Sequence, residues 1–239
     1  MINSYVCVDV ETTGLSAKTE KLIEIGAVKV IDGKVVDRFQ SFLQPGKPIG
    51  ARIEALTGIT DRMLKDAPLA KLVMPKFYDF CGDLPLLGHN LSFDYSFLKK
   101  GMTNENLPFE KEGMDTLRIA RKYLPELESR KLEFLCQHFG IKHTAHRALG
   151  DAEATNTLYQ KLCELFGEKD ASEGANVFLP KALLYNVKKE QPITIAQKEQ
   201  IQRYLKVLDI TLEQDLDMMT RAEASRFMQK YYPQYKERK

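Results

Sequence analysis

Two acidic residues stand at the end of an apolar segment, where a buried strand would not ordinarily carry charge. Asp9 and Glu11 follow the apolar residues 5–8 and are separated by Val10. Side chains alternate along a strand, so Asp9 and Glu11 are expected on one face, where they can hold a divalent cation between them. Carboxylate oxygens are ligands that Mg²⁺ and Mn²⁺ prefer, so the pair predicts a site for one of these ions. By itself the pair is weak, because edge strands also carry charges.

Two later segments add acids and a histidine. Asp94 opens a helix-like stretch after the short apolar run at residues 84–88, and His146 precedes Asp151 in a third segment. With these motifs in this order, residues 4–165 resemble the DEDDh 3′-to-5′ exonucleases of the DnaQ-like family, most closely the epsilon proofreading subunit and the exonuclease domain of bacterial DNA polymerase III. All five catalytic positions of that family are matched: Asp9, Glu11, Asp94, His146 and Asp151. The family's histidine precedes its last aspartate by five positions, a spacing that His146 fits and His143 does not.

The resemblance implies metal-dependent hydrolysis of phosphodiester bonds. Two Mg²⁺ or Mn²⁺ ions about 4 Å apart would activate the attacking water and stabilise the leaving oxygen. By the same resemblance, Asp9 would bridge both ions, Glu11 and Asp151 would hold the ion that carries the water, and Asp94 would support the second ion. His146 would be the general base, since an unperturbed imidazole titrates near pH ~6.5 and is mostly neutral at physiological pH.

A further set of residues is expected to contact the substrate. These positions are Thr12, Thr13, Gly14, Leu15, Leu56, His89, Asn90 and Phe93. In the family, the turn after the first acids holds the terminal nucleotide and its 3′-hydroxyl, and Gly14 would let the backbone approach the sugar closely. Phe93 can stack on a base, although a core position is the alternative. Leu56, together with Ile59, would wedge the last base pair.

The expected function is removal of nucleoside monophosphates from 3′ ends of DNA, single-stranded or frayed, in replication proofreading or repair. Expected partners are therefore DNA 3′ ends and a DNA polymerase subunit. RNA-trimming exoribonucleases use the same five residues and stay an alternative, although residues 12–14 and 56–60 look more like polymerase-associated proofreaders. A non-catalytic nucleic-acid-binding protein is the alternative from another class.

Composition agrees with a cytoplasmic enzyme. The chain has 239 residues and a formal net charge of +2, which neither demands nor excludes nucleic acid. Its four cysteines are far apart, without the C-x-x-C spacing of zinc or redox sites, so reduced thiols are expected. Neither a secretory leader nor an apolar run of the ~20 residues that a bilayer span needs is visible, so no membrane partner is expected.

The elements that must position these residues follow from periodicity. Strands are expected at residues 5–11, 22–31, 35–43 and 84–88, and Asp32-Gly33 is a hairpin signal between the second and third. Helices are expected at residues 53–56, 69–80, 93–100, 116–123, 131–139 and 147–166, with a short helix that Thr60 or Asp61 caps. Strands followed by alternating helix and strand indicate an α/β protein with a mixed sheet. The family implies a ribonuclease H-like fold with five strands and the first strand central.

The polar stretch at residues 167–174 predicts a boundary. We expect an exonuclease domain at residues 1–167, a linker at 168–192 and a small helical module at 193–239. Thr194 and Thr220 each begin a capping-box pattern before an amphipathic helix. The module leans basic, which a solvated face explains, with an auxiliary nucleic-acid contact as the alternative.

Overall fold

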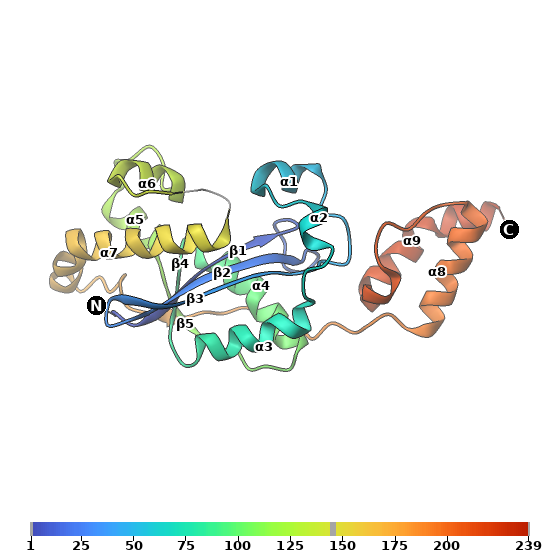
Figure 1. Cartoon of the computed structure of the whole chain (residues 1–239), viewed down its shortest axis with the longest axis horizontal. Helices are drawn as coiled ribbons and strands as arrows, with labels where there is room; N and C mark the ends of the chain where they lie inside the picture. The colour runs from blue at the N-terminus through green and yellow to red at the C-terminus, as the bar shows by residue number, and fades with distance from the viewer. Residues whose placement is uncertain (1, 144–146, 239) are drawn as a thin grey trace.

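A mixed sheet with helices on both faces forms the larger part of the molecule (Figure 1). The computed structural model describes residues 2–143 and 147–238. Six strands are present in this part of the chain, in the order β3-β2-β1-β4-β5-β6. Their bounds are β1 Tyr5–Thr12, β2 Leu22–Ile31, β3 Lys34–Phe42, β4 Leu86–Gly88, β5 Glu112–Asp115 and β6 Lys181–Ala182. Strands β1 to β3 form an antiparallel meander, β4 and β5 run parallel to β1, and β6 is antiparallel to β5.

Helices cover the two faces of the sheet. Their bounds are α1 Ala51–Thr57, α2 Asp61–Leu64, α3 Ala70–Cys81, α4 Leu91–Asn104, α5 Thr116–Tyr123, α6 Leu132–Phe139, α7 Ala148–Glu173, α8 Ile195–Leu208 and α9 Arg221–Glu237. Helices α3 and α4 lie on one face, and α5, α6 and α7 lie on the other (Figure 1). In the described residues, no helix combines the length and the apolar composition that spanning a bilayer requires.

Strand β1 is buried between two hydrophobic cores. Val6, Val8 and Val10 belong to the core beneath α3 and α4, whereas Tyr5 and Cys7 belong to the core beneath α7. Odd-numbered side chains of β1 therefore face α7, and this alternation carries the two following odd positions, Asp9 and Glu11, to the same face. The central place expected for the first strand is confirmed.

Helix α7 lies directly on the backbone of β2. Gly26 makes this possible, because a Cβ atom there would lie 2.0 Å from the backbone nitrogen of Leu149. Any side chain at position 26 would collide with backbone that cannot move out of the way by a rotamer change. The contact sets how close the first turn of α7, which contains Asp151, comes to β1 and β2.

The expected end of this helix at Phe166 is wrong, because α7 continues to Glu173. Asp170 is buried and accepts a hydrogen bond from the Tyr123 hydroxyl at 2.8 Å, so the polar residues here have partners inside the fold. Phe178 is 1% exposed in the core beneath α7. Farther on, β6 pairs with β5 and adds a sixth strand to the five expected. Residues of the segment 168–182 thus pack with the sheet unit, while the division of the chain into domain, linker and module stays a prediction.

The C-terminal module, residues 193–239, contains α8 and α9. Both expected capping boxes are present, with Thr194 and Gln197 at the start of α8 and Thr220 and Glu223 at the start of α9. The two helices enclose a small core of their own, which includes Ile193, Ile201, Met219 and Ala224. In Figure 1 the module lies beyond α2 and α3, connected to the sheet by an extended segment.

Candidate active site

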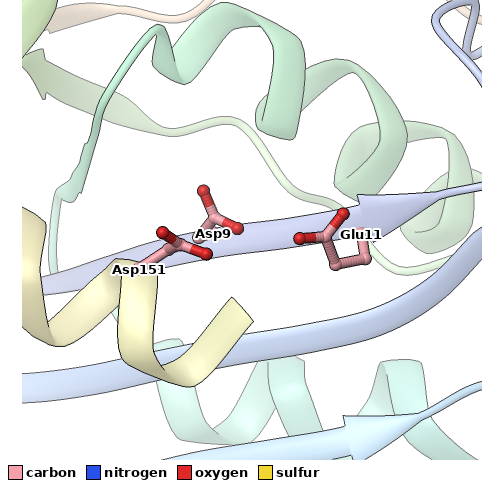
Figure 2. A group of neighbouring side chains, drawn as sticks. All are labelled: Asp9, Glu11 and Asp151. Atoms are coloured by element: carbon pink, nitrogen blue, oxygen red, sulfur yellow. The ribbon is translucent and has the colours of Figure 1, made fainter. Parts of the chain in front are cut away.

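Three carboxylates meet at the C-terminal end of β1. One carboxylate oxygen from each of Asp9, Glu11 and Asp151 lies within 4.8 Å of the other two. Figure 2 shows the three side chains, two from β1 and one from the first turn of α7. Between Glu11 and Thr12 the pairing of β1 with β2 changes register, as in a β-bulge, which re-aims the chain just after the acids.

Asp94 lies beside this group but outside it. Its side chain is 3% exposed, and its Oδ1 atom accepts a hydrogen bond from the Val10 backbone nitrogen at 3.0 Å. Asp94 enters through the first turn of α4, after Asn90 has turned the chain with a φ of 68°. Such left-handed backbone is tolerated by asparagine better than by most residues. The structure thus places Asp94 against the backbone of β1, between the two acids of that strand.

Burial and mutual repulsion disfavour ionisation of these acids. The pKa of Asp9 is raised well above its ordinary value, first by burial and then by the charges of Asp94, Asp151 and Glu11. Burial, with Asp151 and Glu24, raises the pKa of Glu11 to about 7. Burial also raises the pKa of Asp94. A divalent cation would relieve this repulsion, and the all-oxygen donor set suits Mg²⁺ or Mn²⁺.

The start of α7 is fixed by a buried acid that the sequence interpretation missed. Glu24 on β2 is 0% exposed, and its carboxylate accepts hydrogen bonds from Arg147 Nη2 at 3.1 Å and from the Ala148 backbone nitrogen at 3.3 Å. The Arg147 backbone nitrogen in turn donates to Asp151 Oδ2 at 3.0 Å. A lone acid in the apolar run of β2 is the same signal that singled out Asp9 and Glu11, and it could have identified Glu24.

The structure describes only one of the two histidines that lie just before α7 in the sequence. Nε2 of His143 contacts Oδ1 of Asp151, and the His143 side chain is largely buried. His146 lies outside the described residues, so its role as general base stays a prediction. His143 was expected to have no part in the site, and its contact with Asp151 makes it a neighbour of the carboxylate group.

The turn after the acids is held by its own hydroxyls. Thr12 is buried and its hydroxyl donates to the Gly14 carbonyl at 2.7 Å. The Thr13 hydroxyl donates to Glu20 Oε2 at 2.6 Å. Leu15 is 84% exposed, which leaves an apolar side chain at the surface next to the acids in sequence. The four residues thus form an ordered turn with an apolar tip.

Three other expected substrate contacts, His89, Asn90 and Phe93, differ in how far they are free to meet a substrate. Both ring nitrogens of His89 are already bonded inside the protein, Nε2 to the Arg130 carbonyl at 2.8 Å and Nδ1 to the Thr116 hydroxyl at 2.9 Å. Asn90 is exposed, and Phe93 is half-buried beside Phe97, with ring centroids 5.1 Å apart. His89 can therefore reach a substrate only through its ring carbons or its backbone.

Leu56 and Ile59 were expected to act together as a wedge. Leu56 is 52% exposed at the end of α1, so it is free to contact a base. Ile59 is 0% exposed and packs with Ile23 and Leu64, so its expected wedge role is wrong. The glycine between the two ends α1 in a left-handed conformation and turns the chain inward after it.

Comparison with known sequences identifies the family to which this site belongs. The sequence model of a family described as "Exonuclease" matches residues 6–159, more than half of the chain. The chain belongs to this exonuclease family. The matched region of the exonuclease chain contains Asp9, Glu11, Asp94 and Asp151, so every carboxylate of the site lies within it.

Curated relatives are described as DNA polymerase III. The "DNA polymerase III PolC-type" of Oceanobacillus iheyensis is 44% identical over 174 residues, covering 71% of this exonuclease chain and 12% of the relative. The protein of the same description from Caldanaerobacter subterraneus is 38% identical over 200 residues, covering 82% of the chain and 14% of the relative. The chain therefore spans a small part of the length of these relatives. Its expected resemblance to an exonuclease domain of bacterial DNA polymerase III is confirmed.

Solved structures of other exonucleases share the fold. Exonuclease X, in complex with 5′ overhanging duplex DNA, matches with a TM-score of 0.56 at 28% identity, over 68% of this chain and 93% of that chain. E. coli Exonuclease I, in complex with a dT13 oligonucleotide, matches with a TM-score of 0.63 at 17% identity, over 73% of this chain and 44% of that chain. At that identity the second likeness concerns the fold alone. The α/β, ribonuclease H-like fold expected for the exonuclease chain is confirmed, with the added sixth strand.

Proposed function

We propose that this chain is a metal-dependent 3′-to-5′ exonuclease that releases nucleoside monophosphates from 3′ ends of DNA. The observation that carries the proposal is the group formed by Asp9, Glu11 and Asp151, whose oxygen atoms lie within 4.8 Å of one another. Membership of the exonuclease family supports the reaction, and relatives described as DNA polymerase III favour DNA over RNA as substrate. The chain covers only 12% of that relative, so the role of the whole relative is not carried over directly. A role in proofreading or repair is therefore part of the proposal.

The carboxylates are the residues that would hold divalent ions. Asp9 and Glu11 offer oxygen ligands from β1 and Asp151 offers one from α7, while Asp94 lies beside them with its carboxylate bonded to the Val10 backbone nitrogen. When bound, Mg²⁺ or Mn²⁺ supplies activation of water and neutralisation of charge on the leaving oxygen. The raised pKa values of Asp9, Glu11 and Asp94 fit such ions, because a divalent cation would offset the repulsion among these acids.

The chain's own residues would accept the proton from water and hold the substrate. The water oxygen attacks phosphorus and the bond to the 3′ oxygen of the preceding nucleotide breaks. That oxygen takes a proton from solvent, which leaves a 3′-hydroxyl on the strand and a 5′-phosphate on the released nucleotide. We assign to His146 the acceptance of the water proton at a ring nitrogen. The turn at residues 12–15 would hold the terminal nucleotide, and the exposed side chains of Leu15 and Leu56 would contact its base.

A comparison of end-labelled substrates tests this function. Single-stranded DNA and RNA of equal length, labelled at the 3′ or the 5′ end, would be incubated with the protein and Mg²⁺ or EDTA. We expect immediate release of 3′-labelled deoxynucleoside monophosphate with Mg²⁺, a ladder from 5′-labelled DNA, and no reaction with EDTA. Asp9→Asn should lower turnover by orders of magnitude while the protein remains folded. Faster loss of RNA would favour the exoribonuclease alternative, and tight binding of DNA without cleavage would favour the binding protein.

A further inference from the structure

The turn that follows the acids is closed by a pair of hydrogen bonds at its base. The Thr13 backbone nitrogen donates to the Lys21 carbonyl at 2.9 Å, and the Lys21 backbone nitrogen donates to the Thr13 hydroxyl at 3.0 Å. Glu20 lies against the turn, because a Cβ atom at Gly14 would be 2.9 Å from its Cγ atom. The position of Thr13 and Gly14 therefore depends on where Glu20 and Lys21 are held.

The side chain of Lys21 reaches the C-terminal module. Its Nζ atom lies 3.3 Å from Glu223 Oε1 at the start of α9 and 3.8 Å from Glu190 Oε2 in the connecting segment. The side chains of Lys21 and Glu223 are only 19% and 11% exposed, so solvent screens this ion pair less than a surface pair. Although burial acts in the opposite direction, the Lys21 charge lowers the pKa of Glu223 below its ordinary value.

A second ion pair, between Lys47 and Glu20, also holds this turn. Lys47 Nζ lies 3.0 Å from Glu20 Oε2, so the segment after β3 holds Glu20 in place. The neighbouring Gly46 carbonyl accepts a hydrogen bond from the Asp215 backbone nitrogen of the module at 2.8 Å. Met218 of the module packs on Gly46 as well. The ion pair at Lys21 and the contacts at Gly46 thus both lead to the residue pair Glu20 and Lys21.

The junction contains an open pocket lined by charged and apolar side chains. A cavity of about 250 Å³ lies there, and Lys21, Lys100, Glu190 and Met218 are among its lining residues. Lys100 is 6% exposed and its Nζ atom lies 3.1 Å from Glu190 Oε1. The ion pairs of Lys21 and Lys100 with Glu190 thus lie at this pocket.

We propose that the C-terminal module positions the turn at residues 12–15 through the Glu223–Lys21 ion pair and thereby sets the affinity for the terminal nucleotide. Lys21 and Glu223 are positioning residues, since they act on the substrate through Thr13. The inference rests on the proposed function, in which this turn holds the nucleotide. It gives the module a role in substrate binding that needs no contact between the module and nucleic acid.

The test uses the full chain with Glu223→Gln, Lys21→Gln and the double variant. Glutamine at position 223 keeps the capping box, as Gln197 does at the start of α8, while the charge is removed. We expect KM for single-stranded DNA to rise roughly two- to tenfold in each single variant, with kcat changed less than twofold. The double variant should be no worse than Lys21→Gln alone, because that substitution already removes the ion pair with Glu223. Amide hydrogen exchange at Thr13 and Lys21 should become faster in all three.

Matched variants separate positioning from general loss of stability. Asp217→Asn breaks the ion pair of Asp217 with Lys198 inside the module and should leave KM and the exchange rates unchanged. Thr13→Val removes the hydroxyl that Lys21 and Glu20 use and should raise KM.

Three outcomes would overturn the inference: unchanged exchange at Thr13 in Glu223→Gln, unchanged KM in Glu223→Gln, or fully additive effects in the double variant. If the parent chain releases no nucleotide from a 3′ end, the proposed function fails by itself. The exchange rates would still decide whether Glu223 holds the turn.

Discussion

Glu24 lies directly opposite Glu11 on the neighbouring strand, and its side chain is completely buried. Two acids paired across antiparallel strands repel each other, so the arrangement needs a counter-charge. Arg147 supplies it, with Nη2 3.1 Å from Glu24 Oε1, and its charge also lowers the pKa of Glu11 against the larger effect of burial. The pairing links the acids of the sheet to the residue where α7 begins.

Glu24→Gln should therefore lower turnover although residue 24 contacts no substrate in the proposed mechanism. Arg147 would lose its ionic partner, and the first turn of α7 with Asp151 would be held less firmly. We expect turnover or metal affinity to fall roughly 10- to 100-fold, as for other residues that orient metal ligands. Steady-state kinetics and calorimetric titration with Mn²⁺ measure the two effects. Glu153→Gln is the matched control, because it breaks an exposed ion pair between α7 and Arg38 and should change neither.

The stability of the metal-free protein should fall as pH rises. Unfolded carboxyls ionise near pH ~4.5, whereas the pKa of Glu11 is about 7 in the folded chain. Between these values the folded chain binds more protons than the unfolded chain, so the free energy of unfolding decreases with rising pH, by on the order of 3 kcal/mol from Glu11. Denaturant unfolding at pH 5 and pH 8 checks this. Glu11→Gln should flatten the difference, and a metal-free protein that is more stable at pH 8 would contradict the prediction.

Replacement of the two histidines distinguishes their roles. His146→Ala should remove most activity at neutral pH, because the proposed proton acceptor is lost. His143→Ala should be mild, since its partner Asp151 is a proposed ion ligand and needs no histidine for that role. In the parent protein, the rate should climb as pH rises through the imidazole range and then level off. Equal losses from the two substitutions would refute the assignment.

Gly26→Ala should damage the site from a distance. The added Cβ atom would lie 2.0 Å from the Leu149 backbone nitrogen, so α7 would have to move away from β2 and carry Asp151 with it. A displacement of about 1 Å can lower turnover roughly 100-fold, and overpacking costs about 1–3 kcal/mol of stability. Turnover and thermal unfolding measure both. Gly101→Ala is the control, because its Cβ atom would meet the flexible end of Met74 and should leave turnover intact.

Two truncated chains locate the end of the catalytic unit. A chain ending at Gly167 would lose Asp170, Phe178 and β6, so we expect it to unfold or aggregate. A chain ending at Gln191 keeps all of these and should fold, with nuclease activity at a raised KM because the Glu223 contact is absent. Circular dichroism and the end-labelled DNA assay compare them. A folded and active chain ending at Gly167 would restore the boundary expected from composition.

The sequence predicts what depends on local periodicity. Asp9 and Glu11 share a face because strand side chains alternate, and the capping boxes at Thr194 and Thr220 form because their hydrogen bonds are local. The contribution of Gly26 depends on a helix more than a hundred positions away, so no local pattern contains it. Ile59 shows the same limit. The sequence near the exposed Leu56 does not indicate whether the apolar side chain of Ile59 points inward or outward.

The end of α7 was misjudged for a related reason. Polar and small residues such as Asp170 are typical of linkers, and their partners, here the Tyr123 hydroxyl and the Val177 backbone nitrogen, are visible only in the folded chain. Glu24 is different, because it is a single acid within the apolar run of β2 and is therefore visible in the sequence as a candidate site residue. A buried acid in a strand rich in valine and isoleucine calls for a named counter-charge wherever it occurs.

The two residues of β6 also affect how copies of the chain behave toward one another. An uncovered strand edge offers unpaired backbone groups to any neighbouring chain and promotes association. Lys181 and Ala182 pair with Gly113 and Glu112, so this side of β5 is covered by a strand that is short and carries a charge. The opposite side of the sheet ends in β3, whose exposed residues include Lys34, Asp37 and Arg38. Both borders of the sheet thus discourage strand addition, and the segment that leads to the module protects one of them.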